Sequence, residues 1–207
     1  LRGEFQRLIP ASRWQRDTFR CVVLMAADHS TTHFERFDLP QAFDVDAALL
    51  DERYRDSQRM VHPDRYVNAS DQERRLSMQQ ATLLNEGYQI LKDPLRRGRY
   101  LLELLGYRFD DEHHTTSDVD FLMEQMELRE ALGEVRGSAD AFARLGGIME
   151  RIEGDIGKLV DELRQQLGNG TASDLEQAAD CLTRMQFFRK LQDEALELEV
   201  ELEDELA

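Results

Sequence analysis

Apolar residues recur at helical spacing along most of the chain and predict its main elements. Leu50, Tyr54 and Val61 share one face of a predicted helix that ends at Val61. A Ser-Asp-Gln-Glu sequence beginning at Ser70 has the signature of a capping box, and an apolar-periodic segment follows it to about Leu91. The pattern therefore predicts two amphipathic helices joined by a short connection.

Four further helices are predicted after this pair. The first runs from Pro94 to Leu105, with proline in its first turn and Gly106 directly after its end. The others cover residues 118–134, 139–167 and 173–205, and Gly168-Asn169-Gly170 separates the last two. Within 139–167, apolar residues recur at three- and four-residue steps: Leu145, Met149, Ile152, Ile156, Leu159, Leu163 and Leu167. Such a seam is typical of a helix that packs against antiparallel neighbours.

Composition supports an all-α fold and narrows the partners. The chain of 207 residues holds only four prolines and 33% charged residues, and no alternating run indicates a sheet. The net charge of −16 argues against nucleic acid as the main partner, because phosphate binding needs Lys and Arg. No apolar run is long enough to cross a membrane. Cys21 and Cys181 are isolated, which argues against a disulfide framework or a zinc site.

The connection between the first two helices contains the tripeptide His62-Pro63-Asp64. Proline cannot continue an incoming helix, so His62 and Asp64 are expected on a loop. A second block, Asn85 to Pro94, reads NEGYQILKDP and is followed by Arg97 and Tyr100. Together the two blocks resemble a J domain, the module with which DnaJ-type co-chaperones engage DnaK-type ATPase chaperones.

The predicted helix around Phe121 has two apolar stripes. Counting 100° per residue, Leu128 and Leu132 return to within about 20° of Phe121 and form a core stripe. A second stripe points away from it and consists of Leu122, Met123 and Met126. This second stripe either packs against another domain or forms an exposed apolar patch, the usual mark of a protein-binding surface. The residues alone leave both possibilities open.

Residues 121–130, FLMEQMELRE, are similar to the first C-terminal helix of the HscB family. HscB is a specialised co-chaperone that brings the iron–sulfur scaffold protein IscU to the chaperone HscA. The resemblance covers residues 34–207 and implies an all-α fold, with an N-terminal J domain and a C-terminal three-helix bundle in a bent two-domain arrangement. It implies scaffold-binding roles for Leu122, Met123, Met126, Glu127, Glu130 and Phe187, and a core position for Phe188.

The J-domain resemblance implies that His62, Pro63 and Asp64 act on a chaperone. Asp64 would supply an ionic contact, His62 a hydrogen bond and Pro63 a rigid turn. Arg55 and Arg59 on the preceding helix would face the chaperone as well. The acidic neighbours Glu52 and Asp56 dilute this basic surface. Two further departures from the family pattern are Val61, in place of a frequent tyrosine, and Gly87, in place of alanine.

The predicted domain organisation is a leader over 1–33, a J domain over 34–107, a linker over 108–117 and a scaffold-binding domain over 118–207. The leader holds five arginines within its first 24 residues. It is interpreted as sequence upstream of a working start at Met25, as a mitochondrial transit segment, or as a family-atypical extension. The expected location is the cytoplasm, or the mitochondrial matrix if the leader is a transit segment.

Two other functions compete with this interpretation. One is a general J-domain adaptor whose C-terminal bundle delivers a different client. The other is a metal-dependent hydrolase built on His62, Asp64 and the His113-His114 pair. No Gly-rich phosphate loop, nucleophile elbow or H-E-x-x-H motif is present. The sequence therefore predicts a protein that is not an enzyme and has no cofactor.

Overall fold

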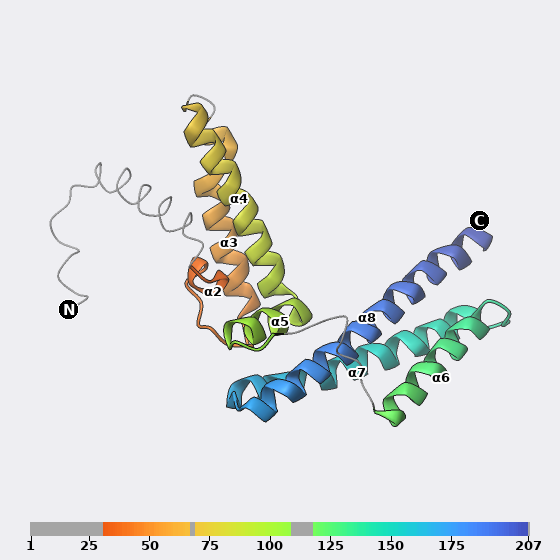
Figure 1. The fold of residues 1–207 in the computed structure, drawn as a ribbon. Coiled ribbons are helices and arrows are strands. Elements are labelled where there is room, and N and C mark those ends of the chain that lie inside the picture. Colours follow the sequence, from red (N-terminus) through yellow and green to blue (C-terminus); the bar gives the residue numbers. More distant parts are fainter. Residues whose placement is uncertain (1–30, 67–68, 109–117, 207) are drawn as a thin grey trace. The chain divides into compact units, whose positions relative to one another are not determined.

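The computed structural model describes residues 31–66, 69–108 and 118–206. Every regular element among these residues is a helix, which confirms the all-α prediction (Figure 1). The contacts divide the chain into two units, the first ending at Asp93 and the second beginning at Pro94. The predicted leader up to residue 30 lies outside the described residues, and so does the predicted linker apart from Arg108.

The first unit is built around an antiparallel helix pair (Figure 1). Its elements are α2 (His33–Arg36), α3 (Ala47–Val61), the 3-10 turn η1 (Pro63–Tyr66) and α4 (Asp71–Lys92). Asp46 begins α3 by accepting hydrogen bonds from the first backbone N–H groups of the helix. Helix α3 ends at Val61 as the sequence predicts, and α4 begins directly after Ser70 and ends one residue beyond Leu91.

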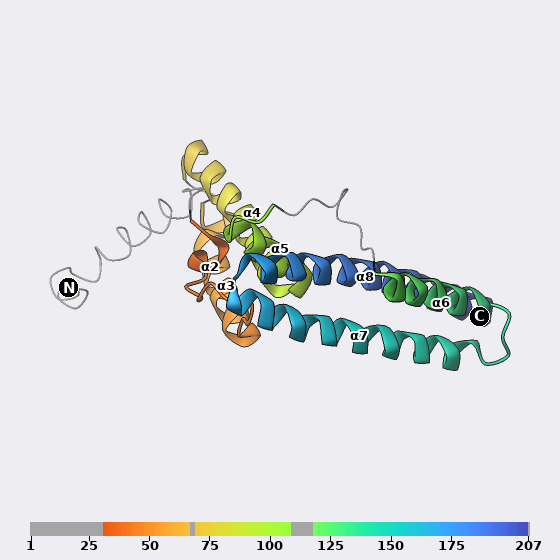
Figure 2. The ribbon, with the colours of Figure 1, turned by 60° about the horizontal axis from the view of Figure 1, so that its bottom comes forward.

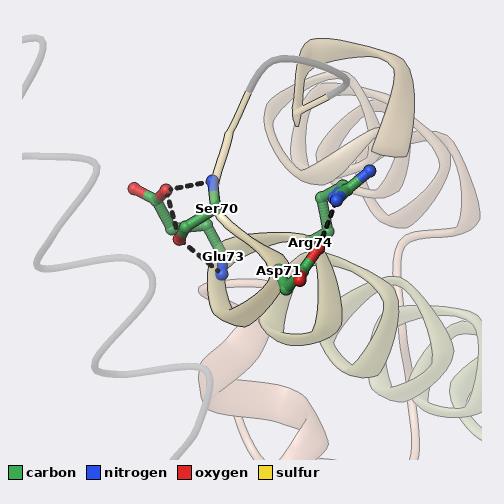
Figure 3. A network of polar contacts seen from close by, with 4 residues as sticks. All are labelled: Ser70, Asp71, Glu73 and Arg74. Carbon is green, nitrogen blue, oxygen red and sulfur yellow. Dashed lines mark hydrogen bonds and ion pairs between the residues drawn. The ribbon is translucent and has the colours of Figure 1, made fainter.

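The capping box at the start of α4 forms as predicted (Figure 3). The Ser70 hydroxyl accepts from the Glu73 backbone N–H at 3.3 Å, and the Glu73 carboxylate accepts from the Ser70 backbone N–H at 2.9 Å. The Ser70 hydroxyl also donates to the Glu73 carboxylate at 2.7 Å, and the hydrogen bonds from this hydroxyl and from the Ser70 backbone N–H lower the pKa of Glu73. Arg74 pairs with Asp71 beside them. The box satisfies N–H groups that would otherwise have no partner at the helix end.

Side chains far apart in the sequence hold α3 against α4. The rings of Tyr54 and Tyr88 stack with centroids 4.0 Å apart and an interplanar angle of 16°. The Tyr54 hydroxyl donates to Asn85 Oδ1 at 2.9 Å, and the Tyr88 hydroxyl donates to Asp51 Oδ1 at 2.7 Å. These contacts fix the register of the two helices, and therefore the position of the turn that joins them.

The second unit contains three long helices that lie alongside one another (Figures 1 and 2). Its elements are α5 (Pro94–Leu104), α6 (Val119–Val135), α7 (Ala141–Asn169) and α8 (Ala172–Leu206). Gly170 ends α7 with a left-handed conformation, φ 69°, that favours glycine. In the predicted α7 seam, Leu145, Ile152, Leu159 and Leu163 are buried, whereas Met149, Ile156 and Leu167 are half-buried.

Helix α5 contacts α7 and α8 and belongs to the second unit. It ends in a Schellman motif, in which the Tyr107 N–H donates to the Leu102 carbonyl and the Gly106 N–H to the Glu103 carbonyl. Burial and the nearby acids Glu176 and Asp180 of α8 raise the pKa of the Tyr107 phenol. The contacts thus divide the chain before α5, whereas the sequence predicts a J domain that extends to residue 107.

Candidate partner-binding sites

The His62-Pro63-Asp64 tripeptide occupies the turn between α3 and α4. His62 is the C-cap residue of α3, and Pro63 begins η1, so proline coincides with the end of the helix. The side chains of His62 and Asp64 are both exposed. The backbone N–H of Asp64 donates to Nδ1 of His62 at 3.3 Å, and the Asp64 carboxylate lies 3.6 Å from the same nitrogen. The turn therefore presents an imidazole and a carboxylate together.

Two hydroxyl groups hold the end of α3, directly before this turn, through hydrogen bonds. Ser77 is buried in α4, and its hydroxyl donates to the Val61 carbonyl oxygen at 2.6 Å. The Tyr66 hydroxyl donates to the Met60 carbonyl oxygen at 3.2 Å. The last carbonyl groups of a helix have no partner within the helix, so these bonds complete the end of α3. Sequence reasoning missed both residues, because no local motif marks bonds that span sixteen positions, from Ser77, or six, from Tyr66.

Arg55 and Arg59 are exposed on α3, on the side away from the buried Leu50 and Val61, as the periodicity predicts. Arg59 forms an ion pair with Asp56 at 3.1 Å. The Arg55 Nε–H donates to the Asp51 carbonyl oxygen at 3.1 Å. The acidic neighbour therefore offsets part of the basic charge beside the turn, as the composition of this helix predicts.

Helix α6 is apolar on two opposite faces. Its buried face consists of Phe121, Leu128, Leu132 and Val135. On the other face the exposed fractions are 43% for Leu122, 52% for Met123 and 72% for Met126. Val119 is 65% exposed and extends this face by one turn toward the start of the helix. Sequence reasoning missed Val119, although its position in the helical period identifies it.

We name the exposed side chains Val119, Leu122, Met123 and Met126 the α6 apolar face. The predicted site residues Glu127 and Glu130 are also exposed on α6. Several large apolar side chains in one row on a helix mark a surface that gains free energy by being covered. Methionine suits such a surface because it is flexible and polarisable.

Phe187 of α8 lies at the margin of this helix. Its ring is half-buried and meets the Phe121 ring edge-on, with centroids 5.7 Å apart and an interplanar angle of 85°. The neighbouring Phe188 is buried, as the sequence predicts. The guanidinium group of Arg129 lies 5.4 Å from the centroid of the Phe187 ring. The structure thus brings Phe187 next to α6, although 66 positions separate it from Phe121.

Asp118 sets the register between α6 and α8. One carboxylate oxygen caps α6 by accepting from the backbone N–H groups of Asp120 and Phe121. The other accepts from Arg184 of α8 at 2.6 Å, and the Arg184 guanidinium also lies over the Phe121 ring. A single side chain therefore begins the helix and joins it to α8.

Of the alternative metal site, only the His62 and Asp64 pair lies in the part of the chain that the structure describes. Within it, no group of three or more His, Cys, Asp or Glu side chains is placed to hold a metal ion. His113 and His114 lie outside the described residues. Cys181 is buried and donates to Glu162, and burial is the main cause that raises the pKa of its thiol to about 12. Among the described helices, none is long and apolar enough to span a membrane.

Known proteins resemble this chain over both units. Residues 117–196 match the family described as the HSCB C-terminal oligomerisation domain. A co-chaperone protein HscB homolog of Shewanella baltica is 42% identical over 172 residues, which cover 83% of this chain and 99% of that protein. A homolog from Shewanella oneidensis is equally similar over the same lengths.

Solved structures agree with this result. Chaperone HscB from Vibrio cholerae is 38% identical with a TM-score of 0.74, covering 83% of this chain and 99% of its own. The human co-chaperone protein HscB is 30% identical with a TM-score of 0.77, covering 84% and 85%. We name the turn at His62-Pro63-Asp64 the HPD turn. The all-helical fold, this turn with its exposed His62 and Asp64, and the identity over most of both chains lead to one conclusion. The chain belongs to the HscB family of co-chaperones.

Proposed function

We propose that this protein stimulates the ATPase of an HscA-type, DnaK-like chaperone and delivers an IscU-type iron–sulfur scaffold protein to it. The HPD turn, with Arg55 and Arg59, contacts the chaperone. The scaffold binds to the α6 apolar face, with Glu127, Glu130 and Phe187 beside it. The proposed place of action is the cytoplasm.

The observation that carries this proposal is the α6 apolar face. Leu122, Met123 and Met126 are each more than two-fifths exposed, on a helix whose opposite face is already buried. Covering this face is favourable by about 25 cal/mol for each Å² of apolar area removed from water. The His62 and Asp64 side chains are also exposed, and they belong to the other unit of the chain. One molecule therefore carries two separate surfaces, and holding two partners together raises their effective concentration for each other.

The proposal predicts that the two activities can be lost independently. Asp64→Ala removes the exposed carboxylate of the turn, and we expect it to abolish ATPase stimulation while the affinity for scaffold stays within about twofold of wild type. Met123→Ala/Met126→Ala/Phe187→Ala removes apolar contact area, and we expect scaffold affinity to fall at least about tenfold while stimulation in the absence of scaffold is kept.

Single-turnover ATPase assays and titration calorimetry measure the two effects. Loss of both activities in either variant would contradict the assignment of separate sites. Equal recovery of scaffold by the wild type and the triple variant would move the scaffold site elsewhere. If the wild type stimulates the chaperone but does not bind scaffold, the C-terminal unit serves another client.

A further inference from the structure

The charged side chains of α6 fall into paired and unpaired groups. Four residues on the helix or at its ends form ion pairs with α7 or α8. These pairs are Asp118–Arg184, Glu124–Arg151, Glu134–Arg144 and Arg136–Glu201. Across residues 31–66, 69–108 and 118–206, by contrast, no ion pair forms to Glu127, Arg129 or Glu130. Asp120 in the first turn likewise forms no ion pair among the described residues, so the unpaired charges of α6 are Asp120 and these three residues beside the α6 apolar face.

The helical period places these unpaired charges on different edges of that face. With Phe121 at 0°, the apolar face spans roughly 100° to 200°, and Glu127 falls at about 240°. Glu134 falls nearby at about 220° and pairs with α7, so Glu127 marks the edge toward α7. Arg129 falls at about 80°, and its guanidinium lies over Phe187 of α8, so it marks the edge toward α8.

The contact between Arg129 and Phe187 leaves the hydrogen-bonding groups of the arginine available. A guanidinium over an aromatic ring interacts electrostatically with the ring face. Its five N–H groups lie in its own plane, in a geometry that fits a carboxylate with two parallel hydrogen bonds. Phe187 thus holds Arg129 at the α8 edge without neutralising its charge.

We propose that the two edges of the α6 apolar face carry opposite charge and bind the scaffold in a single orientation. A basic side chain of the partner lies against Glu127, and a carboxylate of the partner binds Arg129. This inference rests on the proposed function and adds to it the polarity of the partner surface. The partner then presents an apolar strip with a cation along one side and an anion along the other.

Opposite edges discriminate between orientations more strongly than a uniformly acidic rim. A partner turned by 180° would place its carboxylate beside Glu127 and its cation beside Arg129. Like charges brought together at an interface oppose association, and this repulsion is how charged rims exclude wrong arrangements. Glu130, at about 180° within the face, attracts a cation in either orientation and does not distinguish them.

Two double variants with the net charge of the wild type test this proposal. Glu127→Arg/Arg129→Glu reverses the edges, and Glu127→Gln/Arg129→Gln neutralises them. Calorimetry with an IscU-type scaffold protein, at low and high salt, measures the affinity of each. We expect the neutral variant to bind roughly threefold more weakly than wild type, and the reversed variant at least about tenfold more weakly than the neutral one at low salt. The difference should shrink at high salt.

A matched control reverses an exposed ion pair elsewhere in the same unit. Asp161→Arg/Arg164→Asp exchanges an i,i+3 pair on α7, about 15–20 Å along that helix from the contact of Arg151 with α6. Its affinity should equal that of wild type. The inference would be overturned if the reversed and neutral variants bound scaffold with equal affinity, or if the control lost as much affinity as the reversed variant. In either case, scaffold binding by the wild type would still uphold the proposed function. Failure of the wild type to bind scaffold would overturn both.

Discussion

Gly87 lies in the interior of α4, where glycine is less favourable than alanine by about 1 kcal/mol. Its lack of a β-carbon leaves room for α2. An added β-carbon would lie 2.8 Å from Nδ1 of His33 and 3.3 Å from Cε2 of the buried Phe37. The departure from alanine that the sequence shows therefore has a packing reason at this position.

We predict that Gly87→Ala destabilises the protein by about 1 kcal/mol. The cost of overpacking, about 1–3 kcal/mol, exceeds the gain in helix propensity, about 1 kcal/mol. In a His33→Ala background the nearest contact is gone, so the same substitution should become neutral or stabilising. Denaturant unfolding of the four variants measures this sign change. A stabilising Gly87→Ala in the wild-type background would show that His33 moves aside freely.

The pH of that measurement matters because His33 titrates. Burial and the neighbouring Arg36 lower its pKa below the ordinary value of 6.5, and Glu86 opposes them. A histidine whose pKa is lower when folded stabilises the fold above its unfolded pKa, and loses that contribution as the pH falls below 6.5. The unfolding of the four variants is therefore measured near pH 7.5, where His33 is neutral in both the folded and the unfolded protein.

At the scale of elements, the end of α3 determines how the HPD turn is held. The buried hydroxyl of Ser77 in α4 supplies the partner for the Val61 carbonyl, directly before His62. This bond joins the turn to the second helix of the pair. Its loss leaves a buried carbonyl without that donor and allows the end of α3 to loosen.

We predict that Ser77→Ala lowers the free energy of unfolding by about 1–2 kcal/mol and reduces ATPase stimulation severalfold, with scaffold affinity unchanged. Thr82→Ala is the matched control, because its hydroxyl donates to the Met78 carbonyl within the same helix on an exposed surface. Stimulation assayed well below the unfolding temperature separates local loosening from global unfolding. Equal stimulation by both variants would show that the turn is rigid without Ser77.

At the scale of the whole molecule, the position of α5 decides where the chain divides. This helix buries Leu101 and Leu102 and contacts α7 and α8. Tyr107 follows α5 and lies near Glu176 and Asp180 of α8, and burial, together with these acids, raises its pKa. Helix α5 therefore packs with α7 and α8 as part of the second unit.

We predict that residues 94–207 fold more stably than residues 118–207, because the shorter fragment uncovers the surface of α7 and α8 that α5 contacts. We expect the free energy of unfolding of the shorter fragment to be lower by about 1–2 kcal/mol, which corresponds to a melting temperature lower by at least about 5 °C in a domain of this size. Thermal unfolding followed by circular dichroism measures the difference. Equal melting temperatures would indicate that α5 belongs to the J domain, as the sequence predicts.

The sequence by itself determined the features that depend on neighbouring residues. Capping residues such as Ser70, the proline after His62 and the glycines after α5 and α7 specify helix ends through local hydrogen bonds and backbone preferences. The 3.6-residue period distinguishes the buried and exposed faces of α6, because side-chain direction in a helix follows from position alone. The helices, the turn and the two apolar stripes of α6 could therefore be predicted, whereas the exposure of Met123 and Met126 was decided by the tertiary structure.

Only the tertiary structure decided which of these elements meet. The bond from Ser77 to Val61, the fit of His33 against Gly87 and the placing of Arg129 over Phe187 join residues far apart in the chain. Such pairs leave no local pattern, since any exposed arginine or buried serine would look the same in the sequence. Packing alone selects the partners, and with them the charges on α6 that the bundle leaves unpaired.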